Sequence, residues 1–497
     1  MFLLLGVYFR SVFNGVQKIK STMASMRNST MRQKSNKTAS QVISSALQAQ
    51  MAQAMPTPAL KRQLLQQEDE LVSAFKWHYE KLKALPRRTR RALQRYWKRS
   101  LGGVALLLTV GQAPALASTI NVGGPCTLVR AINSANNDTA AGGCARGRGP
   151  DTIVLPVGGT NTLSAVNNTN YGRTGLPVIR GAITIAGNDS TIRRRSDAPP
   201  FRLFAVGRTG DLTLQRTTLS GGIASGGYPN NQGSAIFNLG NITLIGSTIS
   251  GNSADDDAAS LENYEGTLAI KKSTISGNNG YGVSSFLGTV DLTNSTVSGN
   301  SSFGVVATFG QLTVMNSTIS GNSKGVSGAN TSIELTDSTI TGNSSDGVEA
   351  LYATDATLNR SLISGNAASE TVEPRDNDVT LRQTREVFRD ASSYIHADNF
   401  NLLGQNSDAN VGGFSPGVTD IVPEQAVGFM INTTLANNGG PTLTHELLPG
   451  CPAIDAVTNG TCPPPGLDQR GTVRPQDGNA DGGPACDIGS FERRPRK

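Results

Sequence analysis

The chain has 497 residues, of which 16% are charged and 5% aromatic, and it contains 56 glycines. This composition argues against a string of ordinary globular domains of ~150 residues each and favours a repetitive β architecture. The net charge of +7 is uneven, because residues 1–117 hold 19 Lys and Arg but only 4 Asp and Glu, whereas residues 118–497 hold 25 and 33. A basic chain usually suggests nucleic-acid binding, but the excess positive charge lies in a segment that we expect to be removed, so no nucleic-acid partner is expected.

A secretory signal is predicted before residue 118. The run from Arg87 to Arg99 is basic, the run from Leu101 to Val110 is apolar, and Ala115-Leu116-Ala117 forms a small-x-small cleavage site. The apolar run is shorter than the ~20 residues that cross a bilayer, and a buried helix or membrane anchor is the alternative. Since signals begin near the start of translation, either the true start lies downstream or the leader is unusually long. We expect cleavage near Ala117–Ser118 and a secreted or cell-surface protein.

The cysteines agree with export. All five follow the expected cleavage site, and their spacing matches no zinc site. In an oxidising compartment the first two are expected to close a short loop, while two of the last three pair and one thiol is left over. In chain order the candidates are Cys126, Cys144, Cys451, Cys462 and Cys486.

A hexapeptide repeat dominates the central chain. STISGN or a close variant begins at residues 247, 273, 295, 317, 338 and 361, so successive copies are 21 to 26 residues apart. A fixed motif with a drifting period of this length predicts an array of coils with loop insertions. Insertions such as Gly221–Gly233 and Ala254–Glu265 are expected to project as contact loops.

The segments between the motifs predict strands. Runs such as Thr267–Ile270 and Leu312–Val314 alternate and are rich in β-branched residues, and none has the 3.6-residue period of a helix. Two or three strands would form each coil, and stacking coils at ~4.8 Å would place like residues above one another. The asparagines would occupy a turn, because Asn tolerates the left-handed conformation and its amide can bond to its copies. The expected aliphatic stack is Leu219, Ile249, Ile275, Val297, Ile319, Ile340 and Ile363, and the expected asparagine stack is Asn252, Asn278, Asn300, Asn322, Asn343 and Asn366.

The coiled region needs caps, because a solenoid buries apolar surface only between neighbouring coils. Leu128, Ile132 and Ala135 lie on one face of a short predicted helix that Thr127 can cap. The expected organisation is a leader over 1–117 with its signal near 87–117, an N-terminal cap over 118–150, about ten coils over 151–405, and a C-terminal cap region over 406–497.

Several stretches resemble known families. CTLVRAINSANNDTAAGGC (126–144) with DTIVLP (151–156) resembles the CSLREA-type module of bacterial surface proteins, although Val129-Arg130 stands where that motif has Arg-Glu. The repeats resemble right-handed parallel β-helices of the pectin-lyase-like and polymorphic outer-membrane-protein kind. NFNLLG (399–404), residues 435–455 and residues 467–492 resemble the choice-of-anchor Q domain. Together these resemblances imply an all-β, exported, right-handed parallel β-helix protein.

Catalytic residues are not assignable. Enzymes on such folds need convergent acids and a base, but no histidine lies among the repeated motifs, since His396 and His445 follow the last one. The densest acidic run, Asp255-Asp256-Asp257, is more simply a solvated loop. Repeated Ser, Thr and Asn side chains suit a structural or adhesive scaffold that binds extracellular polysaccharide or a host or neighbouring cell surface. A polysaccharide lyase, hydrolase or epimerase is the alternative, and three or more carboxylates within ~5 Å of one another would favour it.

No cofactor is expected except a structural Ca²⁺. Asp477, Asn479 and Asp481 alternate before a glycine, as in the opening of a calcium loop, but Ile488 stands where an EF-hand supplies its bidentate Glu. A plain Asp/Asn/Gly turn is the competing interpretation.

Overall fold

The computed structural model describes residues 117–254, 258–366, 370–375, 378–383, 385–458, 462 and 466–495. Asp255–Asp257 and nearly all of the expected leader lie outside these residues. In the described part of the chain, no helix is long and apolar enough to cross a membrane.

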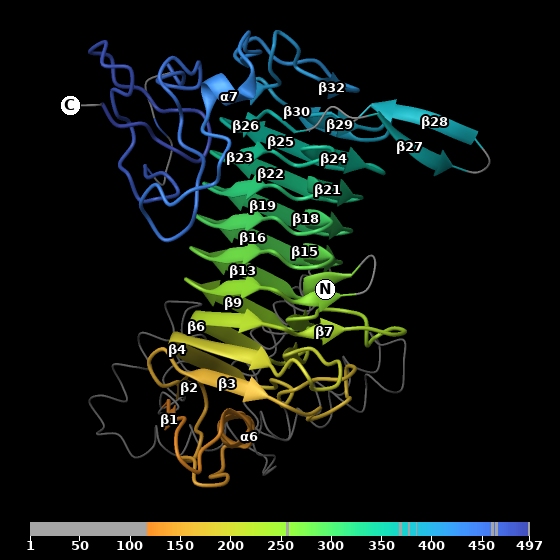
Figure 1. Ribbon diagram of the computed structural model, residues 1–497, viewed down its shortest axis with the longest axis vertical. Helices are drawn as coiled ribbons and strands as arrows, with labels where there is room; N and C mark the ends of the chain where they lie inside the picture. The colour runs from red at the N-terminus through yellow and green to blue at the C-terminus, as the bar shows by residue number, and fades with distance from the viewer. Residues whose placement is uncertain are drawn as a thin grey trace, which may run out of the picture. The chain divides into compact units, whose positions relative to one another are not determined.

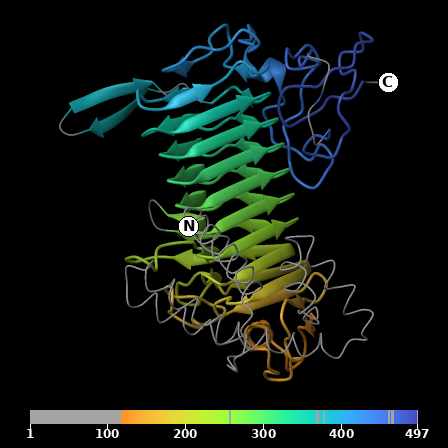
Figure 2. The same cartoon turned by 180° about the vertical axis from the view of Figure 1, so that it is seen from behind.

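Most strands belong to a right-handed parallel β-helix whose coils stack along the long axis of the molecule (Figures 1 and 2). Each central coil contributes one strand to each of three rows. The first row comprises β1 (Thr119–Asn121), β2 (Asp151–Val154), β4 (Ala182–Arg194), β6 (Asp211–Ser220), β9 (Asn241–Ile245), β13 (Thr267–Lys271), β16 (Thr289–Thr293), β19 (Gln311–Met315), β22 (Ser332–Thr336), β25 (Asp355–Asn359) and β30 (Tyr394–His396).

The second row continues from the first through the long strands β4 and β6. Its other members are β3 (Thr160–Leu163), β10 (Thr248–Ser250), β14 (Thr274–Ser276), β17 (Thr296–Ser298), β20 (Thr318–Ser320), β23 (Thr339–Thr341), β26 (Leu362–Ile363) and β31 (Leu402–Leu403). The third row comprises β5 (Phe204–Val206), β8 (Ile236–Asn238), β12 (Ala259–Tyr264), β15 (Tyr281–Phe286), β18 (Phe303–Thr308), β21 (Lys324–Ala329), β24 (Val348–Leu351), β29 (Val387–Arg389) and β32 (Val411–Gly412).

Two strand pairs lie outside the rows. β7 (Ile223–Ala224) pairs with β11 (Ser253–Ala254), and β27 (Glu370–Arg375) forms an antiparallel hairpin with β28 (Asp378–Gln383). The expected contact loop over Ala254–Glu265 is wrong in its second half, because Ala259–Tyr264 is strand β12, which pairs with β8 and is buried at five of its six residues. First-row strands β2 to β30 supply ten coils between residues 150 and 405, the number expected.

The aliphatic stack is confirmed in register. Ile249 pairs with Ile275, Val297 with Ile319, and the chain of pairs runs from Leu219 to Ile363 with every member fully buried. Since each strand alternates inward and outward residues, one residue of slip would turn the whole stack to the surface.

The asparagine stack is a continuous hydrogen-bonded ladder in the interior. Each amide Nδ2 donates to the Oδ1 of the next asparagine over 2.8 to 3.1 Å from Asn252 to Asn366, and backbone N–H groups donate to the same oxygens. The expected left-handed conformation lies on the preceding glycine instead, for example Gly299 at φ 61° and Gly321 at φ 67°. The glycine makes the bend because it has no Cβ to clash, which leaves the asparagine to point inward.

The ladder ends on a carboxylate. Asn366 donates its Nδ2 to Glu386 Oε2 over 2.6 Å, and the backbone N–H groups of Gly365 and Asn366 donate to the two oxygens of the same group. Every rung passes a donor toward the C-terminus, and the carboxyl oxygens of Glu386 accept the donors of the last rung. Burial raises the pKa of Glu386 to about 7.

The N-terminal end is covered by α6 (Leu128–Asn137), as expected. The Thr127 side chain accepts the backbone N–H of Arg130 over 3.3 Å, and Leu128, Ile132 and Ala135 are buried against the first coils. The hydroxyl and the apolar stripe therefore act as the sequence suggests.

The C-terminal region lies along the flank of the coils and has its own apolar cluster around Met430 in α7 (Val427–Met430). Thr296 Oγ1 donates to the carbonyl of Leu443 over 2.7 Å, Thr318 Oγ1 donates to Gln469 Oε1 over 2.7 Å, and Ser490 bonds to a threonine of β23. As a result β17, β20 and β23 are buried at all three residues, whereas β10 and β14 are not. Figure 1 shows this region beside β23 and β26.

Candidate functional site

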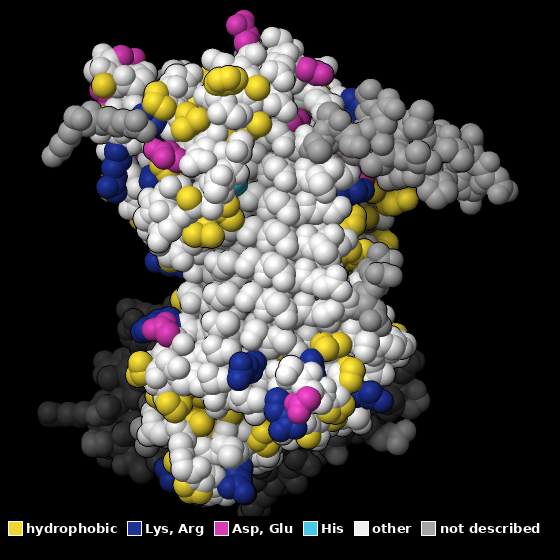
Figure 3. Space-filling view, viewed as in Figure 1, with side chains coloured by type: hydrophobic (Ala, Val, Ile, Leu, Met, Phe, Trp, Pro, Cys, Tyr) yellow, Lys and Arg dark blue, Asp and Glu magenta, His cyan; other side chains and the backbone are white. Residues whose placement is uncertain are grey.

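Partly exposed aromatic rings gather on the outer side of the third row. The aromatic face, as we call it, has two groups of rings. Tyr281 and Phe303 begin β15 and β18, whereas Tyr264 and Phe286 end β12 and β15 and Phe309 lies in the turn after β18. In Figure 3 hydrophobic side chains gather along the edge where Figure 1 shows the ends of β15, β18 and β21. Few charged side chains show on the adjoining surface of the middle coils.

The rings follow the coil register. Tyr264 stacks on Phe286 with ring centroids 5.3 Å apart, and Phe309 meets Phe286 edge-on at 5.8 Å. Tyr281 and Phe303 form an edge-to-face pair at 5.0 Å. Neighbouring coils thus place rings about one coil spacing apart, and such contacts fix the rings in position. Phe309 is 49% exposed.

A buried acid lies behind one end of the aromatic face. Ser284, on β15 between two of the rings in sequence, donates to Glu262 Oε1 over 3.1 Å. Glu262 is 7% exposed, and burial raises its pKa to about 7, against the lowering effects of the Ser284 hydrogen bond and the Arg202 charge. Glu262 and Ser284 are register partners on neighbouring strands, so the carboxyl lies one coil from the hydroxyl on the same side of the sheet.

Arg202 ties two loops to this end of the face. Its Nη1 donates to the carbonyl of Tyr171 over 2.6 Å, its Nη2 donates to the carbonyl of Pro229, and its guanidinium lies 5.1 Å from the Phe237 ring centroid. The Nε atom has no partner among the described residues. Burial lowers the pKa of Arg202 to about 10. The residue thus holds part of the expected Gly221–Gly233 contact loop against the coils.

A second charged group lies at the other end. Lys324 Nζ lies 3.2 Å from Glu349 Oε1 and 3.7 Å from Asp346 Oδ2, and it sits 5.1 Å from the Phe303 ring centroid. Ser327 donates to Glu349 Oε2 over 2.9 Å. A lysine held over a ring by two acids anchors this edge of the aromatic face.

The two glutamates are too far apart to act as a glycosidase acid pair. Strand register places four coil steps between Glu262 and Glu349, which is roughly 19 Å at ~4.8 Å per step. Acid pairs that cleave glycosidic bonds lie within about 10 Å. The described residues include no group of three or more His, Cys, Asp or Glu that could hold a metal.

The predicted calcium ligands Asp477, Asn479 and Asp481 lie close together in an exposed turn. Asp477 Oδ1 and Asn479 Oδ1 both accept the backbone N–H of Asp481, and Asp477 Oδ2 accepts that of Gly482. Asn479 Nδ2 also donates to Asp481 Oδ2 over 3.0 Å. These contacts are typical of an Asp/Asn/Gly turn, so the calcium site stays a prediction.

The cysteines pair as Cys126–Cys144 and Cys462–Cys486. Cys451 is the leftover thiol that the sequence could not identify, and burial raises its pKa to about 12. A thiol this hard to ionise behaves as a small apolar core residue.

The sequence reasoning missed the aromatic face. A signal was present, because Tyr281 and Phe303 occur at matching distances after their preceding STISGN or STVSGN copies, and Tyr264 and Phe286 pair in register. These positions vary from coil to coil, so they do not form part of the repeated motif. The acidic run Asp255–Asp257 lies outside the described residues.

No family model and no curated protein matches the chain. Among solved structures, pectate lyase Pel9A is similar with a TM-score of 0.35 and 15% identity over 69% of this chain and 88% of its own. The A-modules of the Azotobacter vinelandii mannuronan C-5 epimerases AlgE6 and AlgE4 are similar with TM-scores of 0.26 and 0.27, each with 13% identity. Each similarity covers 55% of this chain, with 88% of the AlgE6 module and 90% of the AlgE4 module.

Proposed function

We propose that this chain is an exported β-helix scaffold that binds an extracellular polysaccharide along the aromatic face without cleaving it. The observation that carries the proposal is the set of ring contacts that repeats from coil to coil, with hydroxyl groups beside the rings. An exposed apolar patch with interspersed polar groups marks a binding surface. Rings spaced by roughly 4.8 Å suit an extended ligand whose own units repeat.

A polysaccharide fits this surface better than a host or neighbouring protein surface. Ser284 and Thr308 supply hydrogen-bonding groups among the rings, while the acids Glu262 and Glu349 are buried and held by partners. Sugar rings offer apolar C–H faces for the aromatic rings and hydroxyls for the polar groups. The wide separation of the two acids favours binding over bond cleavage.

Affinity electrophoresis of the purified protein through gels that contain neutral or acidic polysaccharides tests the proposal. We expect at least one polysaccharide to retard the protein, and Tyr281→Ala and Phe286→Ala to reduce the retardation at least tenfold. Tyr394→Ala is the matched control, because Tyr394 is 66% exposed on the first row. Retardation that both face variants leave unchanged would refute the assigned surface. New reducing ends or unsaturated products after incubation would instead support the enzyme alternative.

The proposal includes export and cleavage near Ser118. The two disulfides are what a protein from an oxidising compartment would carry. N-terminal sequencing of secreted material should begin near Ser118, and a mature chain that retains Trp77 or Trp97 would contradict this. The resemblances to the CSLREA-type module and the choice-of-anchor Q domain likewise point to a surface protein.

A further inference from the structure

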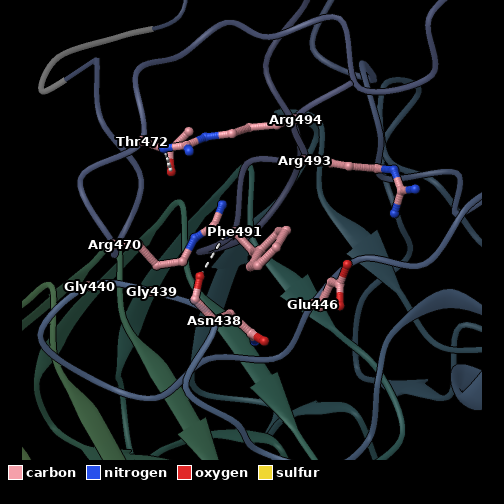
Figure 4. Close-up of a pocket in the computed structure, with 9 residues that line it drawn as sticks. All are labelled: Asn438, Gly439, Gly440, Glu446, Arg470, Thr472, Phe491, Arg493 and Arg494. Atoms are coloured by element: carbon pink, nitrogen blue, oxygen red, sulfur yellow. Dashed lines mark hydrogen bonds between the residues drawn. The ribbon is translucent and has the colours of Figure 1, made fainter. Parts of the chain in front are cut away.

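A pocket of about 240 Å³ lies in the C-terminal region and belongs to no part of the aromatic face. Three separate segments line it, residues 438–440, residues 470–472 and residues 491–494, together with Glu446 (Figure 4). Pockets for drug-sized ligands begin at ~300 Å³. This smaller pocket therefore suits one small group, such as a single sugar unit.

The lining carries more positive than negative charge. Three guanidinium groups, those of Arg470, Arg493 and Arg494, line the pocket with one carboxylate, that of Glu446. Asp468 lies behind the pocket and is paired with Arg470 over 2.6 Å. The side chains that line the pocket therefore include three cations and one anion.

Arg470 is held rigidly in the wall. Its guanidinium lies 3.5 Å from the Phe491 ring centroid, and it donates to both Asp468 and the carbonyl of Asn438. Gly440 has φ 87°, and a Cβ there would lie 2.5 Å from Arg470 Cα, so only glycine lets these two wall segments pack this closely. A wall fixed in this way costs little reorganisation on binding.

Arg494 supplies the adaptable cation. It is exposed, and its Nη2 donates to Thr472 Oγ1 over 3.2 Å, while its Nε and Nη1 atoms make no hydrogen bond with a described residue. Arg493, by contrast, is 6% exposed and donates to the carbonyls of Leu447 and Gly478. Thr472 uses only one of the two Nη2 hydrogens, so the other can pair with the hydrogen of Nε or of Nη1 on one edge of the guanidinium and bind a carboxylate in bidentate geometry.

We propose that this pocket binds a single carboxylate-bearing sugar unit, with its carboxylate on Arg494 and its hydroxyls on Glu446 and Asn438. The site is distinct from the aromatic face and does not depend on the function proposed for it. A uronic acid carries one carboxylate and several hydroxyl groups, which match the charge and the polar groups of the pocket, and it is small enough to fit the pocket volume.

Isothermal titration of the full protein with glucuronate, glucose and acetate tests the assignment. We expect glucuronate to bind at least tenfold more tightly than glucose or acetate, Arg494→Ala to weaken its binding at least tenfold, and Arg494→Lys to weaken it less. Arg193→Ala is the matched control, because Arg193 is also exposed and donates to a threonine hydroxyl, that of Thr162.

Each contrary result would overturn the proposal. Equal binding of glucose would show that the carboxylate is not recognised, and equal binding of acetate would show a site for simple anions only. No glucuronate binding, or binding that Arg494→Ala leaves unchanged, would exclude this pocket. Since Arg494 is exposed, we expect its variants to keep the parent melting temperature. Tyr281→Ala should not alter glucuronate binding, which separates this outcome from that of the aromatic face.

Discussion

The asparagine ladder should make a large contribution to stability, and Asn322→Ala measures it. The Asn322 amide donates to the carbonyl of Val297 and to Asn343 Oδ1, and its Oδ1 accepts both the backbone N–H and the Nδ2 of Asn300. Removal leaves the buried Asn300 N–H without its acceptor and the Val297 carbonyl without this donor. At about 1–3 kcal/mol for each of these two buried groups, the variant should lose about 2–6 kcal/mol of unfolding free energy.

Urea unfolding of the disulfide-intact mature protein is the assay. Both tryptophans, Trp77 and Trp97, lie in the expected leader, so far-UV circular dichroism is a better probe than tryptophan fluorescence. Arrays of coils can unfold in more than one step, and the transition that includes β20 should move. Ser323→Ala is the control, because the Ser323 hydroxyl makes no hydrogen bond with a described residue. If Asn322→Ala unfolds within 0.5 kcal/mol of that control, a typical limit for surface substitutions, the ladder does not hold the coils together.

Three further outcomes are expected. Ile319→Asp should lower the unfolding free energy by several kcal/mol, because Ile319 is fully buried and the new carboxylate would have no partner; a melting temperature equal to that of the parent would show that Ile319 does not face inward. Stability should fall as pH rises from about 4.5 to about 7, because burial raises the pKa of Glu262 and Glu386 from 4.5 to about 7 and the native state keeps protons that the unfolded chain has released. Each group contributes up to about 3 kcal/mol, so Glu386→Gln should reduce but not abolish the pH dependence of the urea midpoint; a variant with the full pH dependence of the parent would show that Glu386 does not contribute to it. Thermal melts with calcium and with a chelator should coincide in the parent and in Asp481→Ala, because backbone N–H groups already occupy the turn's oxygens; a calcium-dependent rise that Asp481→Ala abolishes would establish the metal site.

The repeated motif made the coil register predictable. A six-residue motif at a nearly constant period specifies which residues stack, and the isoleucine and asparagine positions follow from that alone. The conformation of the turn was less accessible, because Gly and Asn both adopt positive φ and adjacent copies of each occur in every repeat. Only the structure shows that Gly321 makes the bend and that Asn322 is left to point inward.

The flanking position of the C-terminal region was harder to foresee, although a trace of it is visible in the sequence. One outward position of the second row is threonine in the middle coils, at residues 296, 318 and 339. In the last two coils it is Leu362 and Leu402, which join the apolar cluster of the C-terminal region. The contacts that fix this arrangement join residues about 150 apart, such as Thr318 and Gln469. Local patterns do not encode such long-range pairs, and for the same reason the sequence could not identify the pocket.

The contacts between the C-terminal region and the coils determine where a coil can be gained or lost. Three successive coils each bond to a different residue of the C-terminal region: Thr296 to Leu443, Thr318 to Gln469 and Thr339 to Ser490. The spacing of these coils is therefore matched to the C-terminal region. If a coil were added or lost among these three, the later threonines would no longer face their partners in the C-terminal region. Among the described residues, the coils before β16 make no hydrogen bond with the C-terminal region, and those that carry Asn252 and Asn278 present the same asparagine donor and acceptor to their neighbours. Duplication or loss of a repeat there would lengthen or shorten the rod and leave both of its ends intact.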